Sequence, residues 1–267
     1  MLQLERHNRI VGLLEQNGAM RVNQIALELA VSRETIRRDL TMLDKKGVLL
    51  RSHGGALLAD NFKTISSSYK APILPDRLQA DSFRTRTTIN VDEKSKIARK
   101  ALSLIKPGDT ILLDCSSSSW FLARQLSDME LTVVTQSTSI INTLVSRNSI
   151  RLIGLGGDYS ASQEAFFGEM AGKQLDEMNI DTLFFSCQGM DLDRGIFAES
   201  RAHEALLQHM FLAAKKVVLL VDGSKHSKIG SERICGFGAL DVLVTEKFND
   251  PLLEKEMIWH NVKVLTI

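Results

Sequence analysis

The chain has 267 residues, 44% of them hydrophobic and 24% charged, which is ordinary for a soluble globular protein and long enough for one small and one larger domain. Its net charge of +1 is unevenly divided, because residues 1–58 carry nine Lys and Arg against six Asp and Glu, a balance that gives modest support for contact with nucleic acid. No apolar run approaches the ~20 residues of a membrane span, the N-terminus lacks the layout of a secretory signal, and three scattered cysteines form no C-x-x-C pair, so we expect a cytoplasmic protein with no membrane segment, disulfide, metal or cofactor.

Three helices are predicted in the N-terminal part. The first is stopped by Asn17-Gly18, and only a tight turn separates the second from Ser32, which can cap the third. In the third helix Ile36, Leu40 and Leu43 fall at i, i+4 and i+7 and give one apolar face for packing. The expected ranges are 5–16, 22–30 and 32–43.

The opposite face of the third helix is polar and carries several arginines. Two short helices at this spacing, the second one basic at its start, form a helix-turn-helix, whose second helix reads base edges in the major groove. The alternative is an amphipathic helix pair with surface arginines and no DNA. The residues expected to contact DNA on this helix are Ser32, Arg33, Glu34, Thr35, Arg37 and Arg38.

A β-hairpin is predicted after the third helix. Lys45-Lys46-Gly47 ends the helix, and Val48 to Ala56 then reads as a strand, a tight turn at Gly54-Gly55 and a return strand. A hairpin in this place is a wing. Arg51 and His53 are expected to meet DNA phosphates there.

The motifs of this region resemble the N-terminal signature of the DeoR family of bacterial transcription regulators. The resemblance rests on T-I-R-R-D-L at Thr35–Leu40, on Gly47, and on R-x-H-G-G-A at Arg51–Ala56. It implies that a winged helix-turn-helix domain, residues 1–57, reads double-stranded operator DNA. It also implies that the rest of the chain senses a phosphorylated sugar.

Residues 58–80 read as a linker, because they hold a serine triplet and two of the four prolines of the chain. From residue 81 to 267 the pattern changes to buried strands that alternate with helices, which predicts a doubly wound, Rossmann-like α/β domain with a parallel sheet. The expected strands are 110–113, 131–134, 151–155, 182–186, 217–221, 242–245 and 262–267. The expected helices are 92–105, where Asp92 can cap the start, 120–126, 137–147, 173–178, 199–214 and 251–259.

Polar and glycine residues follow most of these strands at their carboxyl ends, where open α/β sheets bind ligands. Hydroxyl groups and exposed backbone N–H groups at helix starts suit an anion, Lys225 can add a charge to a phosphate, and Asp114 or Asp222 can accept sugar hydroxyls. Each feature alone is more often a helix cap or a turn. The expected binding residues are Asp114, Ser116, Ser117, Ser118, Ser119, Thr135, Ser137, Gly156, Gly157, Asp222 and Lys225.

The family resemblance extends into this part, through G-D-T-I-L-L-D at Gly108–Asp114 and D-G-S-K at Asp222–Lys225. It implies an effector domain similar in fold to phosphosugar isomerases and CoA transferases, with Glu199 near the effector; the alternative role of Glu199 is to complement a helix dipole. The chain lacks the glycine of the family's D-x-G-[ST]-[ST] loop and has Thr135-Gln136 in place of Thr-Asn. Leu113–Leu126 and Phe185–Asp191 resemble one branch of the family, that of L-fucose operon activators.

The sequence therefore predicts a regulator whose operator affinity changes when a sugar phosphate binds, acting as a dimer or tetramer because one winged head reads a short half-site. The alternative is a phosphosugar isomerase- or transferase-like enzyme that carries a DNA-binding head. No His–acid or paired-carboxylate constellation is visible near Asp114, Glu199 or Asp222 to favour the enzyme. His203 and His209 lie six residues apart, which is poor spacing for two metal ligands on one helix face.

Overall fold

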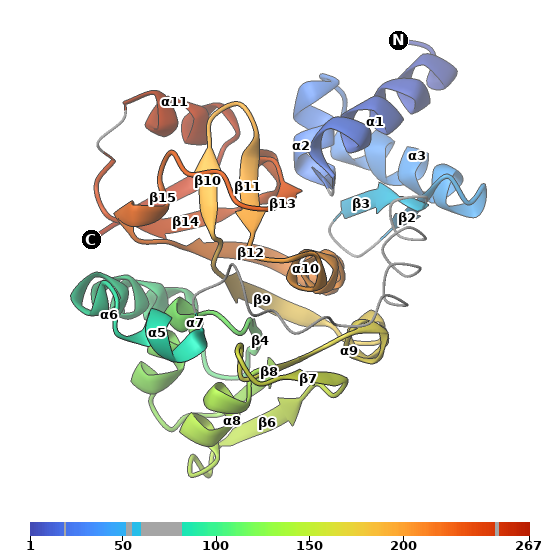
Figure 1. The fold of residues 1–267 in the computed structure, drawn as a ribbon. Coiled ribbons are helices and arrows are strands. Elements are labelled where there is room, and N and C mark those ends of the chain that lie inside the picture. The colour runs from blue at the N-terminus through green and yellow to red at the C-terminus, as the bar shows by residue number, and fades with distance from the viewer. Residues whose placement is uncertain (19, 52–54, 60–81, 249–250) are drawn as a thin grey trace.

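A small helical head and a larger sheet domain follow one another along the chain (Figure 1). The computed structural model describes residues 1–18, 20–51, 55–59, 82–248 and 251–267. The predicted linker at 58–80 lies outside the described residues except for its first two positions. Among the helices of the described part, none is both long and apolar enough to cross a membrane.

The head has the three predicted helices and the predicted hairpin, and a short strand that was not predicted, β1, extends the hairpin to a three-stranded antiparallel sheet. Buried Ile10, Ile25, Ile36 and Leu40 join the three helices in one core. The strands are ordered β1-β3-β2, so that β2 and β3 form the wing. The elements are α1 (Gln3–Asn17), β1 (Met20–Arg21), α2 (Val22–Glu28), α3 (Arg33–Lys45), β2 (Leu49–Arg51) and β3 (Gly55–Leu58).

Helix α3 begins and ends as its sequence predicts. The side chain of Ser32 accepts a hydrogen bond from the backbone N–H of Thr35, 3.1 Å away. After Lys45, Gly47 takes a positive φ of 70°, and the N–H of Val48 donates to the carbonyl of Leu43. This is the Schellman motif, which ends many helices. Because Ser32 caps the helix, the first turn of α3 consists of the residues that are expected to contact DNA.

The turn of the wing differs from the prediction. Gly55 is the first residue of strand β3 and pairs with Arg21, so it does not form the turn, and Gly54 lies outside the described residues. A Cβ at Gly55 would stand 2.3 Å from the carbonyl oxygen of Met20. The glycine is thus required by the close approach of β1 and β3.

A buried carboxylate joins α1 to α3 within the head. Asp39, whose side chain is 1% exposed, accepts hydrogen bonds from Arg6, with Nη2–Oδ1 at 3.0 Å, and faces His7 Nε2 at 3.1 Å. Burial opposes ionisation of Asp39, but the hydrogen bonds from Arg6 and His7 outweigh it and hold its pKa below the ordinary value. The pairing of the two helices therefore depends on one charge cluster as well as on apolar contacts.

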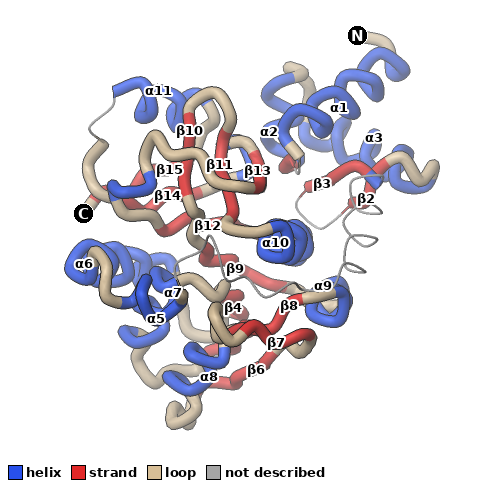
Figure 2. Tube along the Cα trace, in the orientation of Figure 1, coloured by secondary structure: helices blue, strands red, loops and turns tan. Residues whose placement is uncertain are grey.

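The sheet domain is built on seven parallel strands in the order β15-β14-β12-β9-β4-β5-β6, which confirms the doubly wound prediction. Figure 2 shows this sheet as red segments that run from β15 to β6. Strand β4 is the point from which the chain first proceeds to one side, through β5 and β6, and later to the other. The strands are β4 (Thr110–Leu113), β5 (Leu131–Thr135), β6 (Ile150–Gly154), β9 (Ile180–Phe185), β12 (Ala214–Leu220), β14 (Val242–Thr245) and β15 (Lys263–Thr266).

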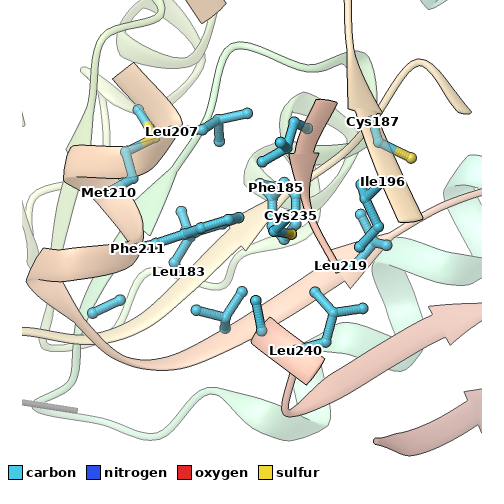
Figure 3. Packing of buried hydrophobic residues seen from close by; sticks show 14 of the residues in the cluster. Leu183, Phe185, Cys187, Ile196, Leu207, Met210, Phe211, Leu219, Cys235 and Leu240 are labelled. Carbon is cyan, nitrogen blue, oxygen red and sulfur yellow. The ribbon is translucent and has the colours of Figure 1, made fainter. Parts of the chain in front are cut away.

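Successive strand residues point to opposite faces and meet different helices. Leu112 packs in the cluster covered by α9, α10 and α11, whereas Ile111 and Leu113 pack in the cluster covered by α6, α7 and α8. On the first face the rings of Phe185 and Phe211 meet edge to face with centroids 5.0 Å apart (Figure 3). The helices are α5 (Phe83–Thr87), α6 (Val91–Ala101), α7 (Ser117–Gln125), α8 (Thr138–Leu144), α9 (Glu169–Asp176), α10 (Arg201–Ala213) and α11 (Pro251–Trp259), with short 3-10 turns η1 (Leu102–Leu104), η2 (Gly223–Lys225) and η3 (Phe237–Ala239).

Two features of the sheet domain differ from the prediction. Asn90, in the left-handed region at φ 50°, takes the N-cap position of α6, and Asp92 lies inside the first turn, where its charge still favours the helix. Short hairpin strands were also missed, because they lie in loops without a long apolar period. They are β7 (Asp158–Ser160), β8 (Ala165–Phe167), β10 (Gly189–Asp191), β11 (Gly195–Ala198) and β13 (Glu232–Cys235).

The head contacts the sheet domain through Arg21 and through Leu57, which is buried in the apolar cluster of the sheet domain. The guanidinium of Arg21 pairs with the carboxylate of Asp241 at 2.5 Å and donates to the carbonyl of Lys215. The N–H of Gly236 also donates to the carbonyl of Asn17 at 3.3 Å. The side chains of Arg21 and Asp241 are only 13% and 29% exposed, so this contact holds two largely desolvated charges.

Candidate functional site

The carboxyl ends of β4 and β9 meet at the place where the strand order reverses. Asp114 follows β4, is fully buried, and its Oδ2 accepts a hydrogen bond from the backbone N–H of Ser186, 3.1 Å away, at the end of β9. Its Oδ1 accepts from the hydroxyls of Ser116 at 2.6 Å and Ser119 at 2.5 Å. Asp114 therefore joins the two strand ends to the start of helix α7.

A cavity of about 290 Å³ opens at this reversal point, within the lower range of small-molecule sites. Its walls come from the ends of β4, β9 and β12 and from the α5–α6 segment, which crosses in front of them. The lining residues are Arg86, Ile89, Asn90, Lys94, Ser116, Ser117, Ser118, Ser186, Cys187, Gln188, Glu199, His203, Asp222, Ser224, Lys225 and Lys228.

The structure brings about half of the expected binding residues into this cavity. Ser116, Ser117, Ser118, Glu199, Asp222 and Lys225 line it. Asp114, Ser119, Thr135 and Ser137 are buried and are not among its lining residues; Ser137 Oγ instead caps helix α8. Gly156 and Gly157 follow β6, which is separated from β4 by β5, and they also lie outside the cavity lining.

The cavity carries more positive than negative charge. Four of its lining residues are Lys or Arg, and two are Asp or Glu. Arg86 binds both carboxylate oxygens of Glu199 at 3.0 Å. Lys94 donates to the backbone carbonyls of Arg86 and Ile89, both at 2.7 Å, and burial lowers its pKa to about 8 although the charge of Asp222 opposes this. An anion is therefore favoured here.

The second carboxylate, Asp222, is held in place at the end of β12. Its Oδ1 accepts from Asn90 Nδ2 at 2.8 Å and from the backbone N–H of Ser224 at 3.0 Å. Burial opposes its ionisation, but the hydrogen bonds from Ser224 and Asn90 keep its pKa below the ordinary value. It is thus a charged acceptor beside Lys94 and Lys225, a combination suited to a ligand with hydroxyls and a phosphate.

Several cavity residues were not foreseen from the sequence. Arg86, Asn90 and Lys94 precede β4, so a search confined to strand ends passes over them. His203 was considered only as a metal ligand, yet it lines the cavity with Nε2 3.7 Å from Asp114 Oδ2. The expectation that no histidine faces an acid at this rim was wrong, because the partner comes from a distant strand end.

The arginine-bearing face of α3 is exposed, as a DNA-reading surface requires. Arg33, Glu34, Arg37 and Arg38 are exposed, while Ile36 and Leu40 are buried beneath them. The following positions complete the expected surface: Ser32 and Arg51 are exposed, Thr35 is half-buried, and His53 lies outside the described residues. Glu34 lies 3.7 Å from Arg37 and 3.6 Å from Arg38, at the long end of ion-pair range, so both arginines remain available to a stronger anion.

Comparison with known proteins matches both parts of the chain. Residues 6–62 match the DeoR-like helix-turn-helix domain, and residues 89–247 match the DeoR C terminal sensor domain. The L-fucose operon activator of Haemophilus influenzae is 33% identical over 257 residues, which cover 96% of this chain and 97% of that protein. The lactose phosphotransferase system repressor of Staphylococcus epidermidis is 32% identical over 269 residues, covering all of both chains.

Among solved structures, ribose 5-phosphate isomerase A of Methanocaldococcus jannaschii is similar to part of the sheet domain. The match has a TM-score of 0.39 and 20% sequence identity, and covers 52% of this chain and 56% of that one. The family models together span the head and most of the sheet domain. The chain therefore belongs to the DeoR family of helix-turn-helix regulators, with a DeoR sensor domain after its DNA-reading head.

Proposed function

We propose that this protein regulates transcription of a sugar-use operon from the cytoplasm, as a dimer or tetramer, and that a sugar phosphate in the cavity at the sheet reversal controls its affinity for operator DNA. The observation that carries the proposal is the cavity itself: cationic, lined by hydroxyls, and present in a chain that also exposes the arginines of α3. The relatives are named as an activator for L-fucose and a repressor for a lactose transport system, which supports a sugar-derived effector.

Within the cavity the proposed roles divide by charge. Lys225 and Lys94 attract the phosphate, and Asp222 accepts hydroxyls of the sugar. Ser117 and Ser118 add the backbone N–H groups of the first turn of α7, where the helix dipole favours an anion. If the effector binds one arrangement of the heads better than another, its binding shifts DNA affinity by that difference.

A sugar phosphate is expected to stabilise the protein against heat, and the unphosphorylated parent is not. A ligand present at ~100 times its dissociation constant adds about 2.7 kcal/mol to the free energy of unfolding. Thermal unfolding of the full chain against a panel of sugar phosphates and their parents measures this. Lys225→Met should weaken the response by about tenfold in affinity, because a charged hydrogen bond to the phosphate is lost.

Lys255→Met is the matched control, since Lys255 is exposed on α11 and lies outside the cavity lining. It should leave the response unchanged. Absence of stabilisation by every phosphate in the panel would contradict the proposed effector class while leaving DNA binding in place.

Arg37→Ala is expected to weaken operator binding by about 1–3 kcal/mol and to relax specificity at one base pair, if Arg37 binds a guanine edge in the major groove. Fluorescence anisotropy with an operator recovered by selection from genomic fragments, and with its single-base variants, measures both effects. Arg9→Ala, an equal change of charge on exposed Arg9 of α1, serves as the control. Equal weakening on all variants would assign Arg37 to a phosphate contact instead.

The second candidate function is a phosphosugar isomerase-like enzyme, and the observation that favours it is Lys94, whose pKa of about 8 lies near the range of a general base. Lys94 nevertheless donates hydrogen bonds to two backbone carbonyls, which hold its nitrogen in one position and leave a third ammonium hydrogen for a bound anion. Incubation with aldose and ketose phosphates separates the two. Turnover that disappears in Asp222→Ala would favour the enzyme.

A further inference from the structure

His203 occupies an unusual position in the wall of the cavity. It is the third residue of α10, where Ser200 caps the helix by accepting from its backbone N–H at 3.3 Å. Its ring meets the ring of Phe167 edge to face at 6.2 Å, and the residue is only 8% exposed although it lines the cavity. The imidazole is therefore held between an apolar ring and the buried carboxylate of Asp114.

The hydrogen bonding between His203 and Asp114 is incomplete. Nε2 of His203 is buried and has no hydrogen-bond partner among the described residues. The nearest acidic atom, Oδ2 of Asp114, is 3.7 Å away, beyond hydrogen-bond distance. Oδ1 of Asp114 accepts from Ser116 and Ser119, whereas Oδ2 accepts from the N–H of Ser186 and keeps room for another donor. A buried polar nitrogen without a partner costs free energy, so this pair favours a group that completes it.

The spacing suits one oxygen atom. Two atoms 3.7 Å apart can both hydrogen-bond an oxygen placed about 2.8 Å from each, at the apex of a shallow triangle. A hydroxyl accepts from the imidazole N–H and donates its own hydrogen to the carboxylate. A phosphate oxygen carries no hydrogen for Asp114 and would be repelled by it. The pair therefore selects a neutral hydroxyl and excludes the anionic end of a ligand.

We propose that His203 is a specificity-determining residue of this cavity, and that with Asp114 it binds a single hydroxyl of a polyol phosphate whose anionic end lies toward Lys225. This inference rests on the proposed function, since it assigns an orientation to the sugar phosphate in the same cavity. The same hydroxyl would bond to Asp114 at the end of β4 and to His203 on α10, and would thus connect these two elements.

The test is isothermal titration calorimetry of the full chain with four probes: inorganic phosphate, ribose 5-phosphate, glucose 6-phosphate and fructose 1-phosphate. In the wild type at least one sugar phosphate should bind more tightly than inorganic phosphate. In His203→Leu that sugar phosphate should lose about tenfold or more in affinity, as expected for the loss of a hydrogen bond in a site that also holds the charged carboxylate of Asp114. The affinity for inorganic phosphate should change by less than about twofold.

Two further variants separate recognition from folding. His209→Leu removes an imidazole from the same helix, where His209 pairs with Asp176 outside the cavity lining, and should leave all four affinities unchanged. His203→Gln places an amide near the position of Nε2 and should restore part of the sugar affinity. If His203→Leu has lost the wild-type circular dichroism, the His203→Gln comparison decides: a reduced but measurable sugar affinity at unchanged phosphate affinity supports the hydrogen bond, whereas wild-type affinity or full loss in that folded variant overturns it.

The outcomes distinguish this inference from the proposed function. Equal sugar affinity in wild type and His203→Leu overturns the role of His203 and leaves the proposed effector class standing. An equal loss for inorganic phosphate and sugar phosphates also overturns it, because the residue then acts on the anion or on the fold. If the wild type binds none of the four probes, both the proposed effector class and this inference fail.

Discussion

The Asp39→Asn variant is expected to lose DNA binding because its head unfolds, while the sheet domain remains folded. Removal of one charge from a buried pair costs about 3–5 kcal/mol, and Asp39 is 1% exposed and is partnered by both Arg6 and His7. In a domain of fewer than about 70–80 residues, the hydrophobic core seldom contributes more than about 3–5 kcal/mol to the free energy of unfolding. The loss is thus as large as the stability of the head, and its unfolding temperature should fall by roughly 12–40 °C.

Circular dichroism during heating measures this effect, together with operator binding at 25 °C. Glu34→Gln is the control for the heating measurement alone, because it removes the same charge from the exposed face of α3 and is expected to change stability by less than about 0.5 kcal/mol. Acid provides a second check. The pKa of Asp39 is lowered in the folded head, so its contribution is fully present above the unfolded pKa of about 3.9 and is lost as pH falls through the folded value. A head that melts alike in Asp39→Asn and Glu34→Gln would contradict the prediction.

The fold was largely predictable because each part of it repeats a local pattern. Ile36, Leu40 and Leu43 mark one helix face, and the strand Thr110–Leu113 is bounded by Gly108 and Asp114 and was predicted to the residue. The caps at Ser32 and Gly47 are also local signals. What the pattern could not place is Asn90, which caps α6 in a left-handed conformation that many residue types avoid.

The cavity was predictable only where it follows the rule of strand ends. That rule found Ser116–Ser118 and Asp222 because they follow β4 and β12, next to or near the reversal point. It also selected Gly156 and Gly157, since the sequence does not reveal that β6 is the edge strand. Arg86, Lys94 and His203 reach the cavity through tertiary packing of helices. The contact between His203 and Asp114 joins residues far apart in the sequence, and no sequence pattern predicts it.

The Asp241→Asn variant is expected to release the head from the sheet domain. Burial lowers the pKa of Arg21 and raises that of Asp241 despite their pairing, so desolvation outweighs their attraction and the pair itself adds little stability. Loss of one partner is different, because Arg21 then remains charged and largely buried, at a cost of about 3 kcal/mol. Asparagine keeps an acceptor for the backbone N–H of Val217, which Asp241 binds at 2.7 Å, and so isolates the effect of charge.

We expect the head to be released and not to unfold, because the contacts between head and sheet domain are weaker than the contacts inside the head. Two hydrogen bonds besides the ion pair join the head to the sheet domain, from Arg21 to Lys215 and from Gly236 to Asn17, and each contributes about 0.5–1.5 kcal/mol. Leu57 of β3 is also buried in the apolar cluster of the sheet domain, which adds about 1.5–3 kcal/mol, so these contacts together are comparable with the cost of the unpaired guanidinium. Arg21 regains water when the head moves away, whereas unfolding would also sacrifice the core of Ile10, Ile25 and Leu40. Undocking therefore costs less free energy than unfolding, and we expect a folded head that changes its orientation relative to the sheet domain.

Spin labels at Glu28→Cys in the head and Lys173→Cys on α9 report this change, because Cys115, Cys187 and Cys235 are buried with pKa values raised by burial and react slowly. The distance distribution should be narrow in the wild type and broad in Asp241→Asn. Arg21→Met/Asp241→Asn removes both charges and should restore a narrow distribution, since an apolar side chain tolerates the site that an unpaired charge does not. A narrow distribution in the single variant would show that other contacts hold the head. Docking would then have to be assigned to the burial of Leu57 in the sheet domain and to the backbone hydrogen bond between Gly236 and Asn17.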